Sequence, residues 1–343
     1  MSQSKRIMFA CVAVVLSMGL VVGLVLSLDL YLHKRFGKVA GLNIRGYRGP
    51  VVKQKRPDEQ RIVVLGGSTA LGYGVAPEES FPAFLERMLN ERRRQEGRGP
   101  VSIVNLAYNT EGAYAYQYNL MYFDYLDYDL ALLYTGYNDL GAEPNTFVLR
   151  RQSPIFRLTG YMPIFPLVFR EKAMALRYGG NLEAAYRNEK TVFRPNLAER
   201  ATASALEAAA SVSESLERQL GRLSKDLEEG IVPVVGPCPP RWTHYCHQVS
   251  LAVSQVLQRG RYAMVVTQPY TSDGHMEQQQ AMVGMLQATF GDHPRLRHVN
   301  LGRAVDLSDS DIAYDGLHLT AEGNEQIARH LMPSIVEVLE DAR

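Results

Sequence analysis

Five short runs rich in aliphatic and β-branched residues, separated by helical patterns, constrain the fold of this chain more than any other feature. They occupy residues 61–65, 101–106, 130–134, 262–267 and 296–301. Apolar runs of about 4–8 residues are typical of strands that are buried on both faces of a parallel sheet. Parallel strands need crossover connections, so the sequence predicts an α/β fold with helices on both faces of one sheet.

The composition fits one main folded domain. Hydrophobic residues make up 46% of the chain and charged residues 21%, a balance typical of a globular protein rather than a disordered one. Lysine and arginine (37) nearly equal aspartate and glutamate (36), which argues against nucleic acid as a partner. The predicted domain spans residues 61–343, and residues 141–230 are expected to form a largely helical insertion after the third run.

A long apolar run lies near the N-terminus. Residues 7–28 contain no charged side chain. At about 1.5 Å per residue, this run is long enough to cross a hydrocarbon core of about 30 Å. We therefore predict a single transmembrane anchor over residues 1–32 and a juxtamembrane linker over residues 33–60. A cleaved signal peptide is the alternative, although its apolar region would be shorter and would end in small residues.

Two observations bear on the side of the membrane, and they oppose each other. Basic residues are more numerous after the apolar run than before it, which favours a cytoplasmic domain. Cys238 and Cys246 enclose a short loop that a disulfide could close in an oxidising compartment, with two free thiols as the alternative. A zinc site that includes His244 and His247 is disfavoured, because the spacing matches no usual zinc pattern. We expect a periplasmic or otherwise extracytoplasmic domain.

The insertion has two recognisable parts. Residues 154–169 are apolar but interrupted by prolines, and they are too short for a second membrane span. They are expected to form either a lid or membrane-touching flap, or simply a hydrophobic segment packed on the domain. Residues 197–229 carry leucines at helical spacing and predict a long amphipathic helix. Trp242, Gln268 and His275 are interpreted as structural residues rather than as the lining of a pocket.

A serine in a glycine-rich turn directly follows the first run. Ser68 stands in the segment Gly66-Gly67-Ser68, where glycines allow a sharp turn and the close approach of a ligand. The turn lacks the lysine and the following serine or threonine that a phosphate-binding P-loop requires. By itself, the segment is explained equally well by an ordinary connection between a strand and a helix.

Two polar turns follow the second and third runs. The backbone N–H of Gly112 and the side-chain amide of Asn138 are the kinds of donor that stabilise a tetrahedral oxyanion. Each turn taken alone is also explained by the backbone tolerance of glycine and asparagine.

A carboxylate and an imidazole stand three residues apart before a predicted C-terminal helix. In such a turn Asp315 could fix the tautomer of His318 while the other ring nitrogen removes a proton from a serine. An aspartate that binds turn amides beside an incidental surface histidine is the alternative.

In their order along the chain, these four segments resemble the four blocks of the SGNH, or GDSL-like, hydrolase family. The blocks of that family contribute a serine, a glycine, an asparagine and an Asp-x-x-His pair, which correspond here to Ser68, Gly112, Asn138, and Asp315 with His318. The resemblance covers roughly residues 61–140 and 262–338. Gly67 replaces the aspartate of the usual Gly-Asp-Ser block, and Glu111 precedes Gly112 after a longer approach than usual.

The resemblance implies a flavodoxin-like α/β/α sandwich whose five parallel strands have the order 2-1-3-4-5. It also implies an esterase that cleaves carboxylic esters of a saccharide, lipid or small molecule without a metal or organic cofactor. Ser68 would be the nucleophile, with Asp315 and His318 as its partners, and the Ser68 and Gly112 amides and Asn138 would form the oxyanion hole. The alternatives are an O-acyltransferase with the same triad and a catalytically silent saccharide- or lipid-binding module.

Overall fold

The computed structural model describes residues 3–165, 168 and 237–342. Among these residues, five parallel strands form one sheet in the order β2-β1-β3-β4-β5. The strands are β1 (Gln60–Gly66), β2 (Val101–Asn105), β3 (Leu130–Thr135), β4 (Tyr262–Thr267) and β5 (Leu296–Asn300). The predicted α/β fold class and strand order are confirmed.

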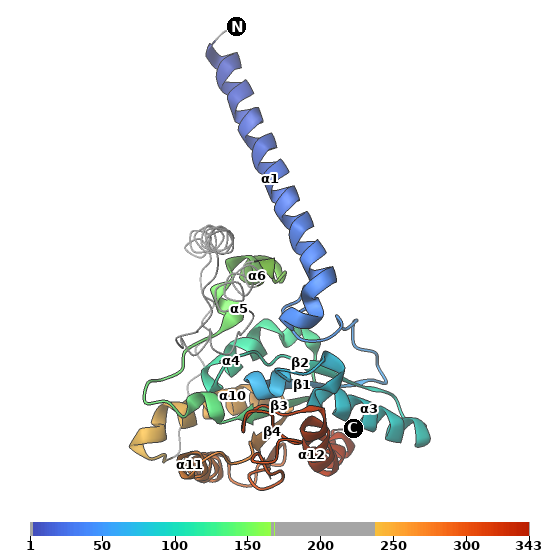
Figure 1. Cartoon of the computed structure of the whole chain (residues 1–343), viewed down its shortest axis with the longest axis vertical. Helices are drawn as coiled ribbons and strands as arrows, with labels where there is room; N and C mark the ends of the chain where they lie inside the picture. Colours follow the sequence, from blue (N-terminus) through green and yellow to red (C-terminus); the bar gives the residue numbers. More distant parts are fainter. Residues whose placement is uncertain (1–2, 166–167, 169–236, 343) are drawn as a thin grey trace.

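Helices cover both faces of the sheet (Figure 1). The longer ones are α3 (Phe81–Gln95), α4 (Ala113–Tyr122), α10 (Thr243–Gln258), α11 (Asp273–Phe290) and α12 (Ala321–Asp341). The shorter ones are α2 (Ser68–Leu71), α5 (Leu149–Gln152) and α6 (Pro154–Thr159), together with the 3-10 turns η1 (Pro77–Glu79), η2 (Asp124–Leu126), η3 (Tyr137–Asp139) and η4 (Pro240–Trp242). The amphipathic helix predicted over residues 197–229 lies outside the described residues.

The core is divided between the two faces because side chains alternate along each strand. Val63 and Leu65 of β1 belong to a cluster that contains residues of α4, α10 and α11. Ile62 and Val64 belong to a second cluster with residues of α3 and α12. The sheet is therefore the middle layer of a three-layer sandwich, which explains why its strands read as continuous apolar runs.

The N-terminal helix α1 (Gln3–Ala40) rises away from the α/β domain (Figure 1). Its segment Val12–Arg35 is long and apolar enough to cross a membrane. α1 continues into the segment that was expected to be a linker, residues 33–60. Leu42 and Tyr47, which follow it, are each only 1% exposed. The chain after α1 is thus packed on the domain.

The C-terminal part of α1, which forms its foot on the domain, is attached by polar contacts. The carboxylate of Asp29, which is 2% exposed, accepts hydrogen bonds from the backbone N–H groups of Ile164 (2.9 Å) and Phe165 (2.7 Å). His33 Nε2 donates to the carbonyl oxygen of Met162 at 2.9 Å. The described part of the apolar segment 154–169 therefore contacts α1. A disulfide joins Cys238, which precedes α10, to Cys246 in the first turn of that helix.

Candidate active site

The predicted site residues all lie beyond the carboxyl ends of the strands. Ser68 begins α2 directly after β1, Gly112 caps α4 after β2, and Asn138 lies in η3 after β3. Asp315 and His318 lie in the loop before α12. β1 lies between β2 and β3, so the order of the strands reverses there. In open α/β sheets, ligands bind at this kind of switch point.

Three of these side chains form a continuous hydrogen-bonded chain. Ser68 Oγ lies 2.8 Å from His318 Nε2, and His318 Nδ1 lies 2.6 Å from Asp315 Oδ2. Because His318 Nδ1 faces a carboxylate, it carries the proton, which leaves Nε2 to accept the hydrogen bond from the serine hydroxyl. The fold thus brings together groups that are 250 positions apart in the sequence.

The carboxylate of Asp315 also organises its own turn. Its Oδ1 accepts hydrogen bonds from the backbone N–H groups of Leu317 (3.0 Å) and His318 (2.6 Å). Partial burial by itself would raise the pKa of Asp315, but the hydrogen bonds from His318 and Leu317 outweigh it and hold this pKa below its usual value. Asp315 therefore binds the amides of its own turn and also contacts the imidazole.

Two tyrosine rings flank the imidazole, and the sequence analysis did not identify either of them. The Tyr73 ring lies 5.0 Å from the His318 ring, and the Tyr314 ring lies nearly parallel to it at 5.9 Å. The Tyr314 hydroxyl donates to the carbonyl oxygen of Tyr73 at 3.1 Å, which joins the two loops. Their proximity in sequence to Ser68 and Asp315 was the available signal.

The turn before Ser68 has no room for a side chain at Gly67. A Cβ atom built on Gly67 would lie 2.0 Å from Asn138 Nδ2 and 3.1 Å from the carbonyl oxygen of Glu111. The same Asn138 Nδ2 donates to Glu111 O at 2.9 Å. The Asn138 amide therefore lies against the turn that precedes Ser68. In this chain, a side chain at position 67 would have to displace the Asn138 amide.

Gly112 and Asn138 together form one wall of the site. The backbone of Gly112 is extended (φ −109°), a conformation that any residue adopts. A Cβ atom built on it would nevertheless lie 2.5 Å from Asp139 Oδ1, so a side chain here would have to displace the Asp139 carboxylate. Gly112 is the N-cap of α4, and N–H groups at helix starts have no partner within the helix. The Gly112 N–H therefore has no partner within α4.

A buried carboxylate follows Asn138. Asp139 Oδ2 accepts a hydrogen bond from the N–H of Ala113 at 3.0 Å. Its Oδ1 is buried and has no hydrogen-bond partner among the described residues. Burial raises the pKa of Asp139 to about 7, and the hydrogen bond from Ala113 only partly opposes this effect.

Gln268 connects the loop of the serine to the loop of the asparagine. It follows β4, and its Oε1 accepts a hydrogen bond from the N–H of Tyr137 at 2.8 Å while its Nε2 donates to Thr69 Oγ1 at 3.0 Å. It is 2% exposed, as is Trp242, and His275 is completely buried. All three are packed in the interior, and Gln268 in addition braces the loops of the site.

Comparisons with known proteins add a likeness in fold. No family model matches the chain, and no curated protein matches it. The matching solved structures include the psychrotrophic esterase EstA from Pseudoalteromonas sp., with 12% identity, a TM-score of 0.43, and coverage of 82% of this chain and 99% of that one. A family 3 carbohydrate esterase from Clostridium thermocellum has 14% identity and a TM-score of 0.40, with 83% and 100% covered. A GDSL-like lipase from Bacteroides thetaiotaomicron has 10% identity and a TM-score of 0.39, with 89% and 97% covered.

The strand order, the layering and the places of the four segments are properties of this chain itself. Together they make this an SGNH-like, or GDSL-like, fold.

Proposed function

We propose that this chain is a serine esterase that cleaves a carboxylic ester through an acyl-serine intermediate. The observation that carries the proposal is the hydrogen-bonded chain from Ser68 Oγ through His318 to Asp315, with distances of 2.8 and 2.6 Å. A serine hydroxyl is a weak nucleophile at neutral pH, and a base within hydrogen-bond reach activates it. Ester substrates of a saccharide, lipid or small molecule all suit this chemistry.

Each member of the chain has one role. As Ser68 Oγ attacks the acyl carbon, its proton moves to His318 Nε2, and the Asp315 carboxylate stabilises the imidazolium through Nδ1–H. The imidazolium then gives its proton to the departing alcohol, which leaves the acyl group on Ser68. Water, deprotonated by the same His318, releases the acid and restores the serine.

The developing oxyanion would be held by donors on two sides of Ser68. The Ser68 N–H lies in the first turn of α2, where backbone N–H groups have no partner within the helix. Asn138 Nδ2 carries two hydrogens, and only one is needed for its bond to Glu111 O. The second hydrogen is available to the oxyanion. The Gly112 N–H, which was expected to be a third donor, belongs to the same trans peptide unit as the Glu111 carbonyl and points away from the Asn138 amide, so it does not share an oxyanion with that amide. Loss of one such donor typically lowers kcat by about 10²–10³-fold.

We further propose that the enzyme is a single-pass membrane protein with its α/β domain outside the cytoplasm. The apolar segment Val12–Arg35 and its attachment to the domain through Asp29 support an anchor. The Cys238–Cys246 disulfide supports an oxidising compartment. A reporter enzyme fused to the C-terminus and assayed in intact cells would test the orientation, and activity only in the cytoplasm would contradict it.

Labelling with a fluorophosphonate tests the esterase proposal most directly. The full chain in detergent should be labelled at Ser68 and should hydrolyse aryl esters of graded acyl length, whereas Ser68→Ala should do neither. Ser310→Ala, which removes an exposed serine hydroxyl, is the matched control and should behave as wild type. Equal labelling of wild type and Ser68→Ala would refute the proposal. Preferential transfer of the acyl group to an added alcohol or saccharide would identify an acyltransferase instead.

A further inference from the structure

A buried ion pair lies directly behind the wall that contains Gly112 and Asn138. Arg150 Nη1 donates to Glu111 Oε2 at 2.9 Å, and the two side chains are 0% and 1% exposed. The carboxylate is held from two further directions, by the N–H of Leu149 (3.0 Å) and by the Asn119 side-chain amide (2.8 Å). Buried charges are tolerated only when they are paired and hydrogen-bonded in this way.

The other edge of the guanidinium holds the segment that follows α1. Arg150 Nε and Nη2 both donate to the carbonyl oxygen of Gly46, at 3.0 and 2.7 Å. This segment is joined in turn to the foot of α1, because the N–H of Met162 donates to Ile44 O at 2.9 Å and Met162 O accepts from His33. Arg150 therefore connects Glu111 to the base of the apolar helix.

The backbone of Glu111 gives this pair its influence on the site. The carbonyl group of Glu111 and the N–H of Gly112 belong to one planar trans peptide unit, so they point in opposite directions and turn together. That carbonyl accepts the hydrogen bond from Asn138 Nδ2 at 2.9 Å. The orientation of this single peptide unit thus fixes the acceptor that holds the Asn138 amide, and the Gly112 N–H points away from that amide.

We propose that Glu111 and Arg150 are positioning residues that fix this peptide unit and thereby align the oxyanion donor Asn138 Nδ2. The inference rests on the proposed esterase function. Neither side chain touches the substrate; the Glu111 carboxylate anchors its own main chain, and Arg150 anchors the carboxylate to Gly46 O. A catalytic donor displaced by about 1 Å can cost about 10²-fold in rate.

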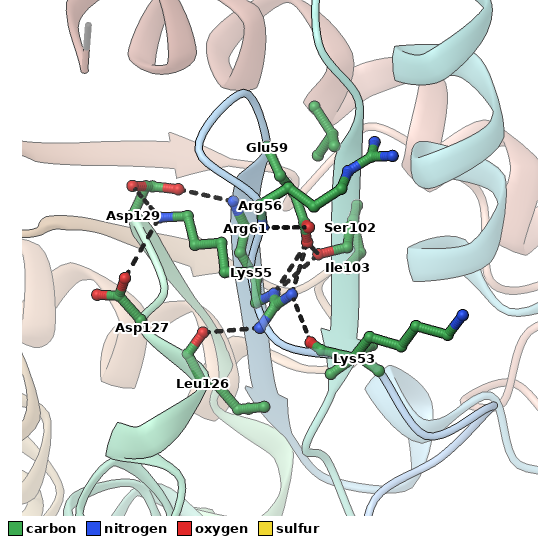
Figure 2. Close-up of polar contacts among 12 residues, drawn as sticks. Lys53, Lys55, Arg56, Glu59, Arg61, Ser102, Ile103, Leu126, Asp127 and Asp129 are labelled. Carbon is green, nitrogen blue, oxygen red and sulfur yellow. Dashed lines mark hydrogen bonds and ion pairs between the residues drawn. The ribbon is translucent and has the colours of Figure 1, made fainter.

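The test compares two buried arginines in the full chain. In Arg150→Gln, we expect kcat and the rate of fluorophosphonate labelling to fall about 10²-fold, with KM changed less than about twofold, because the lost interactions act mainly in the transition state. Arg61→Gln is the matched control. Arg61 is also buried, donating to Glu59 Oε1 (2.7 Å) and Leu126 O (2.9 Å) (Figure 2). It lies near the start of β1, whereas Ser68 follows the end of that strand. The Arg61→Gln substitution should lower the thermal midpoint of unfolding and leave kcat unchanged.

A second variant covers the case in which Arg150→Gln does not fold. Arg150→Lys keeps a positive charge opposite Glu111 but loses the planar fork that reaches Gly46 O. We expect it to fold and to show a smaller loss of kcat in the same direction. Wild-type kcat in a folded Arg150→Lys or Arg150→Gln protein, or an equal loss in Arg61→Gln, would overturn the proposal.

Hydrogen exchange separates this inference from the proposed function. In Arg150→Gln or Arg150→Lys, the backbone amides of residues 108–116 should exchange faster than in wild type, and in Arg61→Gln they should not. This measurement needs no substrate. If wild-type Ser68 is not labelled, the esterase proposal fails, whereas unchanged exchange at residues 108–116 refutes the positioning role by itself.

Discussion

At the scale of single residues, the clearest constraint in the site is steric. A methyl group on Gly67 would lie 2.0 Å from Asn138 Nδ2, so Gly67→Ala must displace the Asn138 amide. We expect this substitution to lower kcat by about 10²–10³-fold, the cost of one misplaced oxyanion donor. Steady-state kinetics and fluorophosphonate labelling measure the effect.

A glycine in open space provides the control for Gly67. A Cβ atom on Gly284, in the interior of α11, would meet no atom within 4 Å. Gly284→Ala should keep full activity and raise stability by about 0.5–1 kcal/mol, since alanine favours the helix. Wild-type kcat in Gly67→Ala would show that Asn138 can move without loss.

The buried Asp139 makes a pH-dependent contribution to stability. Its pKa is raised from 3.8 to about 7 in the folded protein by burial, so between these values the folded state holds a proton that the unfolded state has released. Rising pH therefore favours unfolding across this range. The asparagine of Asp139→Asn does not titrate in this range. The thermal midpoint of wild type should therefore fall relative to that of the variant from pH 5 to pH 8. Parallel pH curves for the two proteins would contradict the raised pKa.

At the scale of helices and strands, the sequence located the sheet well. The predicted runs 61–65 and 130–134 lie within β1 and β3, because both strands are buried on two faces and therefore read as unbroken apolar segments. The order of the strands came from the family resemblance, as did the expected proximity of Ser68 to His318. Local patterns contain no such long-range information.

The contacts between loops could not be predicted in the same way. Arg150 and Glu111 are 39 positions apart and belong to no periodic pattern, so their burial depends entirely on tertiary packing. Gln268 was interpreted as structural because one glutamine after a strand has many explanations. The steric role of Gly67 required the position of Asn138, which only the fold supplies.

The foot of α1 offers a prediction at the same scale. Asp29→Ala would leave the buried N–H groups of Ile164 and Phe165 without their acceptor. Each unsatisfied buried group costs about 1–3 kcal/mol, so the thermal midpoint of the full chain should fall clearly. Asp292→Ala removes an exposed carboxylate and should leave the midpoint unchanged. Equal midpoints for both variants would show that Asp29 does not hold α1 to the domain.

At the scale of the whole molecule, the boundary between anchor and domain lies earlier than residue 61. Leu42 and Tyr47 are each 1% exposed, and the N–H of Arg48 donates to Asn105 O at 3.0 Å, at the end of β2. Burial of a large apolar side chain is worth about 1.5–3 kcal/mol. These contacts make residues 41–49 part of the folded domain rather than of a linker.

Two N-terminal deletions test this boundary. A chain that lacks residues 1–28 keeps Asp29 and Gly46, and we expect it to fold and to be labelled at Ser68 by fluorophosphonate. A chain that lacks residues 1–49 loses two buried side chains and the Gly46 acceptor of Arg150. It should unfold at a lower temperature and be labelled much more slowly, because Arg150, which pairs with Glu111 behind the wall formed by Gly112 and Asn138, then lacks one of its partners. Equal midpoints and labelling rates for the two chains would return residues 33–60 to the role of a linker.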